Sequence, residues 1–355
     1  MTDAIPIVTR DPRFLAGREL VERGLADEAV EIYATLLEET RLQYGHASIE
    51  TAPAYYEYGN TILRAVAKQQ ITATEENTDD VETKCEERDV AATAAENRIN
   101  HSKSSEEQPS AEAMVENSKD GGDKYKPEEM LLKVQSEGVS DKDDGEDLVL
   151  SLEMIENSFS ILEEYKDSIG KGDNKYLKWV ERQLPRVLMG IGDNLSKLNR
   201  HADAADAYSR ALELRKACFE EIAEREKNNK NKFTTEYLKA HRLVCEAYIL
   251  IAEELLMCPD NEDILTTETH SLIVKADERL SYARGYYDQA RDVLQEVIVC
   301  MGSLPRNIDL GREKENVCFL ATLVMGVGEQ IAAIGEKSDE ANSSKEHVKK
   351  KARKG

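Results

Sequence analysis

The stretch Leu15–Leu37, LAGRELVERGLADEAVEIYATLL, decides the fold, because it reads as two helices joined by a glycine turn. Gly17 and Ala29 fall where two antiparallel helices would cross, and small side chains at a crossing let the backbones approach closely. Tyr33 follows on the second helix, where a large side chain covers the seam to the next pair. The stretch therefore predicts one antiparallel helix pair, the unit of a helical repeat.

A second copy of this pattern lies at Leu188–Leu214, LMGIGDNLSKLNRHADAADAYSRALEL. Gly192, Ala204 and Tyr208 stand at the same offsets, and Asn199 takes the place of the turn glycine. Two copies in register favour a tetratricopeptide repeat (TPR) over a chance match. The predicted fold is all-α: a TPR helical-hairpin solenoid whose last apolar helix, near residues 315–334, caps the exposed end.

One repeat is interrupted. YYEYGNTIL, residues 55–63, has the spacing of a first repeat helix, but the expected second helix appears only at residues 146–167, EDLVLSLEMIENSFSILEEYKD. Between them, residues 71–146 carry 22 acidic and 9 basic side chains and few large apolar ones. Such a composition predicts disorder, and closing a long loop costs only about (3/2)RT ln n. The second helix pair can therefore close across an acidic disordered insertion.

These patterns divide the chain into four parts. Residues 1–70 hold repeat 1 and the first helix of interrupted repeat 2, and residues 71–146 form the insertion. Residues 147–335 hold the rest of repeat 2, repeats 3 and 4 and the capping helix, and residues 336–355 form a basic disordered tail. The acids that represent the insertion are Glu75, Glu76, Asp79, Asp80, Glu86, Glu87, Glu106, Glu107, Glu128, Glu129, Asp141, Asp143 and Asp144.

The composition excludes several classes of function. A formal net charge of −23 would repel nucleic acid and anionic membranes, and it favours a basic protein partner. No apolar run approaches the roughly 18 residues that span a bilayer. The sequence has no GxxxxGK[ST] loop, HExxH or GxSxG motif and no CxxC pair. We therefore expect a binding protein without enzymatic activity, cofactor or metal.

The first helix of each TPR pair lines the concave surface, so its outward residues are candidates for partner binding. Acids mixed with a few apolar side chains on such a surface suit a basic amphipathic helix or tail. The candidates are Tyr56, Glu57, Asn60, Leu63, Met189, Asp193, Lys197, Glu246, Ile249 and Glu253.

The basic run KKKARK ends the chain and fits a nuclear import signal. It indicates a nuclear protein, with a cytoplasmic pool left open. Its residues are Lys349, Lys350, Lys351, Arg353 and Lys354.

The whole arrangement resembles the interrupted-tetratricopeptide (SHNi-TPR) histone chaperones, the family that includes nuclear autoantigenic sperm protein. The resemblance rests on residues 31–63, the acidic break, residues 190–214 and the basic ending. It implies binding of core histones of types three and four, and a role in histone supply and nucleosome assembly. Linker histone and a second copy of the chain stay open as further partners.

The alternative is a general TPR adaptor, either a heat-shock chaperone co-factor or a cargo adaptor. A heat-shock clamp needs Lys, Asn and Arg at set concave positions to hold a C-terminal carboxylate. Here Phe14, Arg18 and Gly190 occupy the corresponding positions, which favours the histone-binding interpretation.

Overall fold

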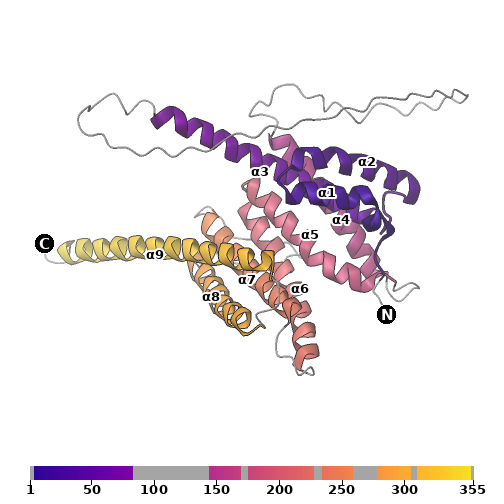
Figure 1. The fold of residues 1–355 in the computed structure, drawn as a ribbon. Helices are drawn as coiled ribbons and strands as arrows, with labels where there is room; N and C mark the ends of the chain where they lie inside the picture. Colours follow the sequence, from indigo (N-terminus) through magenta and orange to yellow (C-terminus); the bar gives the residue numbers. More distant parts are fainter. Residues whose placement is uncertain are drawn as a thin grey trace, which may run out of the picture. The chain divides into compact units, whose positions relative to one another are not determined.

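The computed structural model describes residues 4–82, 144–168, 175–227, 234–258, 278–304 and 310–352. Throughout these residues the secondary structure is helical, without strands (Figure 1). A short 3-10 helix, η1 (Ile7–Arg10), precedes the α-helices. These are α1 (Pro12–Glu22), α2 (Ala26–Tyr44), α3 (Ala52–Glu82), α4 (Asp144–Asp167), α5 (Leu177–Lys197), α6 (His201–Lys227), α7 (Thr235–Met257), α8 (Arg279–Ser303) and α9 (Arg312–Ala352).

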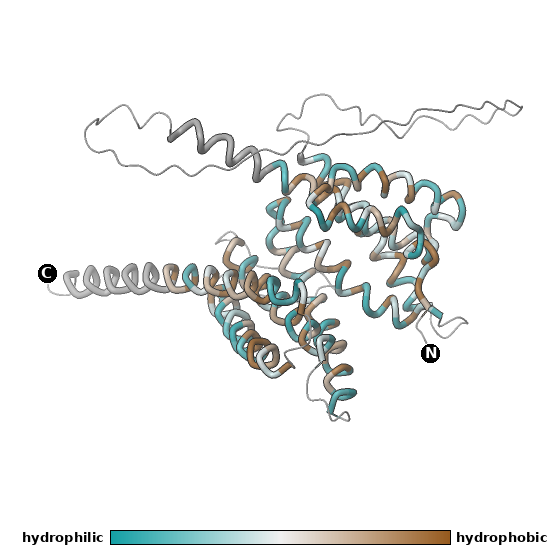
Figure 2. Tube along the Cα trace, in the orientation of Figure 1, coloured by the Kyte–Doolittle hydropathy of each residue, from teal (hydrophilic) through white to brown (hydrophobic). Residues whose placement is uncertain are grey.

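Helices that follow one another in the sequence pack as neighbours, from α1 with α2 and α4 with α5 through to α8 with α9. The chain divides by its contacts into two units, residues 71–140 and the remainder, and the helix packing described below lies in the remainder. Apolar and polar residues alternate along the described helices, as expected when each helix buries part of its surface (Figure 2). This is the arrangement of a helical repeat solenoid.

The turns between α1 and α2 and between α5 and α6 have the same backbone geometry. Gly24 has φ +77° and Asn199 has φ +58°, the left-handed region that suits glycine and asparagine. The amide that follows each turn residue donates to a carbonyl five residues earlier, Leu25 to Leu20 at 2.9 Å and Arg200 to Leu195 at 2.8 Å. The two turns predicted from the sequence are therefore confirmed.

Both glycines expected at helix crossings have a tyrosine pressed against them. A Cβ added to Gly17 would lie 2.7 Å from the Tyr33 ring, and one added to Gly192 would lie 2.4 Å from the Tyr208 ring. Tyr33 is fully buried and its hydroxyl donates to the Phe14 carbonyl oxygen at 3.0 Å. Only glycine lets these two backbones approach so closely.

The helix that completes the pair begun by α3 is α4, although the two are far apart in the sequence. The Ser151 hydroxyl donates to the Gly59 carbonyl oxygen at 2.7 Å across 92 residues of sequence, and Ser158 donates to Ala52 at 2.9 Å. A Cβ on Gly59 would lie 2.7 Å from Ile155. The predicted packing of residues 148–162 against the helix that starts near Tyr55 is confirmed.

The α3 and α4 bounds correct the predicted insertion at both ends. Helix α3 runs to Glu82, so Glu75, Glu76, Asp79 and Asp80 lie within a helix and not in a disordered loop. Helix α4 starts at Asp144, which also belongs to a helix. The other named acids, Glu86, Glu87, Glu106, Glu107, Glu128, Glu129, Asp141 and Asp143, lie outside the described residues.

The C-terminal tail is also more helical than predicted. Helix α9 continues to Ala352, so residues 336–352, which include Lys349, Lys350 and Lys351, do not form a disordered tail. The residues after Ile334 hold many Ala, Glu, Lys and Ser, and no proline stops the helix. Arg353 and Lys354 lie outside the described residues.

The first part of α9 has an apolar side that packs against the preceding helices. Val317, Leu320, Val324, Val327 and Ile331 are buried, and α9 contacts α7 and α8, as expected of a capping helix. The opposite side exposes Phe319 by 72%. By length and composition, Arg312–Ile334 could cross a membrane, which contradicts the expectation that no segment reaches that threshold. Core helices of other proteins meet the same criterion.

Candidate binding groove

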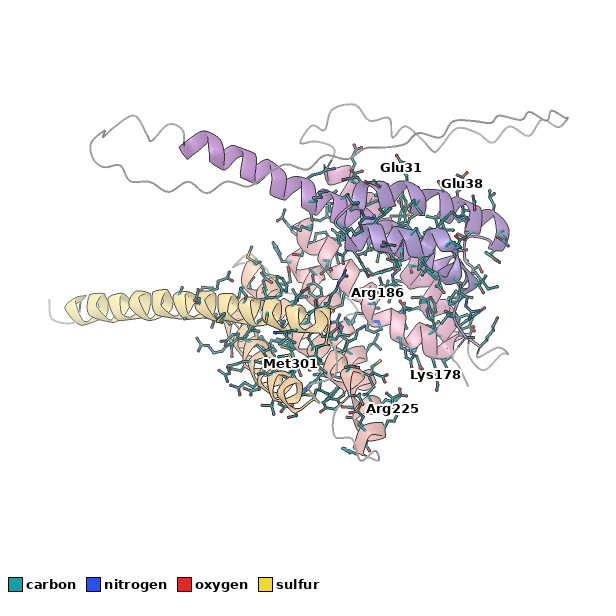
Figure 3. All side chains as sticks on the ribbon, viewed as in Figure 1. Glu31, Glu38, Lys178, Arg186, Arg225 and Met301 are labelled. Carbon is teal, nitrogen blue, oxygen red and sulfur yellow. The ribbon has the colours of Figure 1, made fainter. Side chains whose placement is uncertain are left out.

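The first helices of successive pairs, α1, α3 and α5, enclose a cavity of about 210 Å³, with residues of α4 and the N-terminal segment completing its wall. We call it the arginine cavity, because Arg18 of α1 and Arg186 of α5 both line it. Figure 3 labels Arg186 on α5. The other lining residues are Ile5, Thr9, Phe14, Pro53, Tyr56, Glu57, Ser158, Leu162, Trp179, Gln183 and Val187.

Glu57 is the only acid among the residues that line the arginine cavity, and it is already paired within the chain. Its side chain is 5% exposed, and Arg186 Nη2 donates to its Oε1 at 2.9 Å. Arg18 Nε lies 4.0 Å from the same oxygen. A buried carboxylate needs such partners, because leaving it unpaired costs several kcal/mol. Two arginines against one carboxylate leave the cavity with a net positive charge.

Arg186 also stacks on an aromatic ring. Its guanidinium carbon lies 4.4 Å from the centre of the Tyr56 ring. Burial lowers the pKa of Arg186, but Tyr56 and Glu57 more than offset this and raise it on balance. The Arg186 and Arg18 side chains are 40% and 49% exposed, so both remain partly open to solvent.

Farther along α5, Asp193 offers an accessible acid in crowded surroundings. The side chain is exposed, yet desolvation by the surrounding atoms raises its pKa to about 6, partly offset by a hydrogen bond. The Tyr208 hydroxyl donates this bond to Asp193 Oδ1 at 2.7 Å. A cationic partner would stabilise the ionised form of an acid that is both accessible and poorly solvated.

On α7, Glu246 belongs to an ion-pair network with two buried arginines. Arg215 Nη1 lies 3.0 Å from Glu246 Oε2 and also donates to the Leu243 carbonyl oxygen at 2.6 Å. Arg242 lies 4.0 Å from Glu246, and its Nε donates to Glu313 of α9 at 2.7 Å. Burial lowers the pKa of Arg215. The network therefore links α6, α7 and α9, and Glu246 is not an independent surface acid.

The expectation that all ten groove candidates point outward is wrong for six of them. The buried candidates are Tyr56, Glu57, Asn60, Leu63, Met189 and Ile249. Glu246 and Glu253 are half-buried, whereas Asp193 and Lys197 are exposed. The reason is geometric: a first helix in a layered stack contacts its own pair mate and the helices on either side, so little of its circumference reaches solvent.

Three residues that sequence reasoning passed over contribute to this region. The sequence patterns drew no attention to Arg186 or Trp179, and Arg18 entered only as a residue that does not match a heat-shock clamp. All three line the arginine cavity, and Trp179 is half-buried there. A pair of arginines at outward positions on two first helices was the signal that could have indicated an anion-compatible site.

Among the described residues, no group of three or more histidine, cysteine or acidic side chains is arranged to hold a metal ion. Comparison with protein-family models gives no match to this chain. Comparison with curated proteins likewise gives no significant match.

Proposed function

We propose that this protein is a histone chaperone of the interrupted-tetratricopeptide class, which binds histones of types three and four. The observation that carries the proposal is the α3–α4 pair, joined by Ser151–Gly59 and Ser158–Ala52 hydrogen bonds on either side of a strongly acidic segment. A folded stack supplies shape, and a linked polyanion supplies charge for a strongly basic client.

The tetratricopeptide assignment has its own support. The α1–α2 and α5–α6 turns share their left-handed residue and hydrogen bonds. In both pairs a glycine on the first helix faces a buried tyrosine on the second, Gly17 with Tyr33 and Gly192 with Tyr208. A shared turn and a shared crossing in two separate pairs are expected of true repeats, in which each unit buries the same face.

In the proposed mechanism, the acidic segment gathers histones by long-range attraction and the stack contacts them directly. Asp193 is an acid on the stack that suits a cation, because it is exposed and its pKa is raised. Glu253 is half-buried, and burial followed by the neighbouring Glu254 raises its pKa as well. A bound lysine or arginine would relieve both effects. The terminal KKKARK run supports a nuclear site of action.

One observation favours the alternative, a TPR adaptor. Arg18 and Arg186 give the arginine cavity a net positive charge within an acidic chain. Paired arginines hold a carboxylate well, so an adaptor that takes the C-terminus of a partner would use this cavity.

A binding experiment separates the two functions. Purified full-length protein is immobilised and offered the refolded complex of histones three and four, or a peptide with a free C-terminal carboxylate, at physiological ionic strength. The proposal expects retention of the histones and their transfer to added DNA during nucleosome assembly. Retention of the carboxylate peptide alone, with histones in the flow-through, would support the adaptor and overturn the proposal.

A further inference from the structure

A second cavity, of about 490 Å³, lies between α6 and α8 with α7 at its base. Figure 3 marks the two outer helices by Arg225 on α6 and Met301 on α8. Three tyrosines line the cavity: Tyr248 from α7, and Tyr282 and Tyr286 from α8. We call it the tyrosine cavity. It shares no lining residue with the arginine cavity, so the two are separate sites.

The tyrosine rings present aromatic surface at different depths. Tyr248 is buried, and its ring centre lies 6.1 Å from that of Tyr286 at an interplanar angle of 46°. Tyr282 is 42% exposed. Tilted rings that line a recess from its base to its surface can contact more than one side of an inserted group. Such an arrangement suits a cation with an aliphatic stem, because the faces of aromatic rings are electron-rich.

The charged residues that line the tyrosine cavity are one lysine and one glutamate. Lys216 of α6 already places its Nζ 4.8 Å from the centre of the Tyr248 ring, so the chain itself uses this ring as a cation site. Glu213 lines the same cavity and is exposed. Burial is the main cause of the raised pKa of Tyr286, and the negative charge of Glu213 adds to it. A positive group that entered the cavity would meet the tyrosine rings and the Glu213 carboxylate, and it would compete with the Lys216 ammonium for the Tyr248 ring.

Gly285 keeps one wall of the tyrosine cavity open. It lies inside α8, and a Cβ added there would meet nothing within 4 Å. Glycine inside a helix costs roughly 1 kcal/mol relative to alanine. Unlike at Gly17 and Gly192, no close helix crossing requires glycine at this position. A larger side chain here would instead project into the cavity, which it lines.

We propose that the tyrosine cavity binds the cationic side chain of a peptide partner, a lysine ammonium or an arginine guanidinium, between Tyr248, Tyr282 and Tyr286 and beside Glu213. The site lies outside the groove of the proposed function. Its test uses defined small ligands, so it does not depend on whether histones are the partner.

The test is fluorine NMR of the full-length protein labelled with 3-fluorotyrosine, with each cavity resonance assigned by a single Tyr→Phe variant. Three probes are titrated: the N-acetyl, N-methylamide derivatives of lysine, arginine and citrulline. Citrulline matches arginine in shape but is uncharged. We expect the cavity tyrosines to shift with the two cationic probes, with affinity about fivefold or more above that for citrulline. The lysine and arginine arms show which cation the site prefers.

Two matched pairs of variants locate the effect. Gly285→Leu should fill the cavity and abolish the shifts, whereas Gly302→Leu, the same change at another open position of α8, should preserve them. Lys216→Met removes the internal cation from the Tyr248 ring and should tighten cationic probe binding severalfold. Lys239→Met removes an equal charge from α7 away from the cavity and should change the affinity for the cationic probes less.

Absence of tyrosine shifts with either cation, equal binding of citrulline, or shifts that survive Gly285→Leu would each overturn the proposal. These outcomes are independent of histone binding, which is measured separately. If Gly285→Leu removes probe binding but leaves histone affinity intact, the cation site stands and serves another partner. If histones fail to bind the unaltered protein while the probes still do, the proposed function fails and the cation site stands.

Discussion

Replacing Gly59 by alanine measures how closely α3 and α4 approach across the acidic segment. The added Cβ would lie 2.7 Å from the Ser151 carbonyl oxygen, 2.7 Å from Ile155 Cγ1 and 3.1 Å from Met154 Cβ. The carbonyl oxygen is backbone, so it cannot rotate away as the tip of a long side chain can. The α3–α4 spacing would have to widen.

The expected magnitude is a difference between two opposing effects. Alanine in place of glycine stabilises a helix interior by about 1 kcal/mol. Overpacking a close contact typically costs about 1–3 kcal/mol, and losing the 2.7 Å Ser151–Gly59 hydrogen bond would add about 1 kcal/mol. We therefore expect Gly59→Ala to lower the free energy of unfolding by about 1–3 kcal/mol.

Gly285→Ala in α8 is the matched control, because a Cβ there meets no atom within 4 Å. It should raise the free energy of unfolding by up to about 1 kcal/mol through helix propensity alone. Urea denaturation followed by far-ultraviolet circular dichroism measures both variants. If Gly59→Ala stabilises the protein as much as Gly285→Ala, α3 and α4 do not pack closely at Gly59. The main evidence that these two helices form an interrupted pair would then be lost.

Three further predictions concern charge. Folding raises the pKa of Asp193 from 3.8 to about 6, so ionisation of this side chain destabilises the folded state as pH rises through that interval. Asp193→Asn should therefore raise the free energy of unfolding above pH 6 by about 1 kcal/mol, after allowing for the exposure of the side chain. Thermal melts across this pH range should show the gain vanish near pH 4. Glu246→Lys should lower the free energy of unfolding by roughly 3 kcal/mol, because it leaves buried Arg215 beside a second cation. Glu253→Lys should change it by only about 0.5 kcal/mol. Equal effects of the two variants in urea denaturation would refute the assigned ion-pair network. Replacing residues 83–140 with a short Gly/Ser turn should leave the helical content of the stack intact. Histone binding should weaken and lose part of its salt dependence. If the shortened protein no longer unfolds cooperatively in thermal melts, the replaced segment contributes to the hydrophobic core.

The sequence was sufficient for the features that depend on local rules. The turn residues Gly24 and Asn199 were predictable, because few residues tolerate a positive φ. The partner of α3 was predictable as well, because a helix with an apolar face must be covered, and residues 148–162 carry the matching apolar stripe.

The sequence failed where the outcome depends on more than two helices. Ile249 was expected on the groove surface but is fully buried, because α7 contacts α6, α8 and α9 together. Glu57 was expected as an outward residue of the groove, and its pairing with Arg186 joins residues 129 positions apart, which no helical periodicity reveals. The length of α9 was missed for a different reason, since polar composition alone does not end a helix that has no stop signal.

The separation of Gly59 and Ser151 by 92 residues has a consequence for how the chain is made. At a synthesis rate of about 5–20 residues per second, α3 leaves the ribosome roughly 5–20 seconds before α4 exists. Helix formation takes about a microsecond, so during that interval the apolar side of α3, with Ile62 and Val66, has no pair mate to cover it. The α1–α2 pair has no such delay, because a single turn joins its helices. During translation the second helix pair therefore cannot form until α4 has been synthesised. A nascent chain arrested between residues 83 and 143 would be the form most in need of a chaperone.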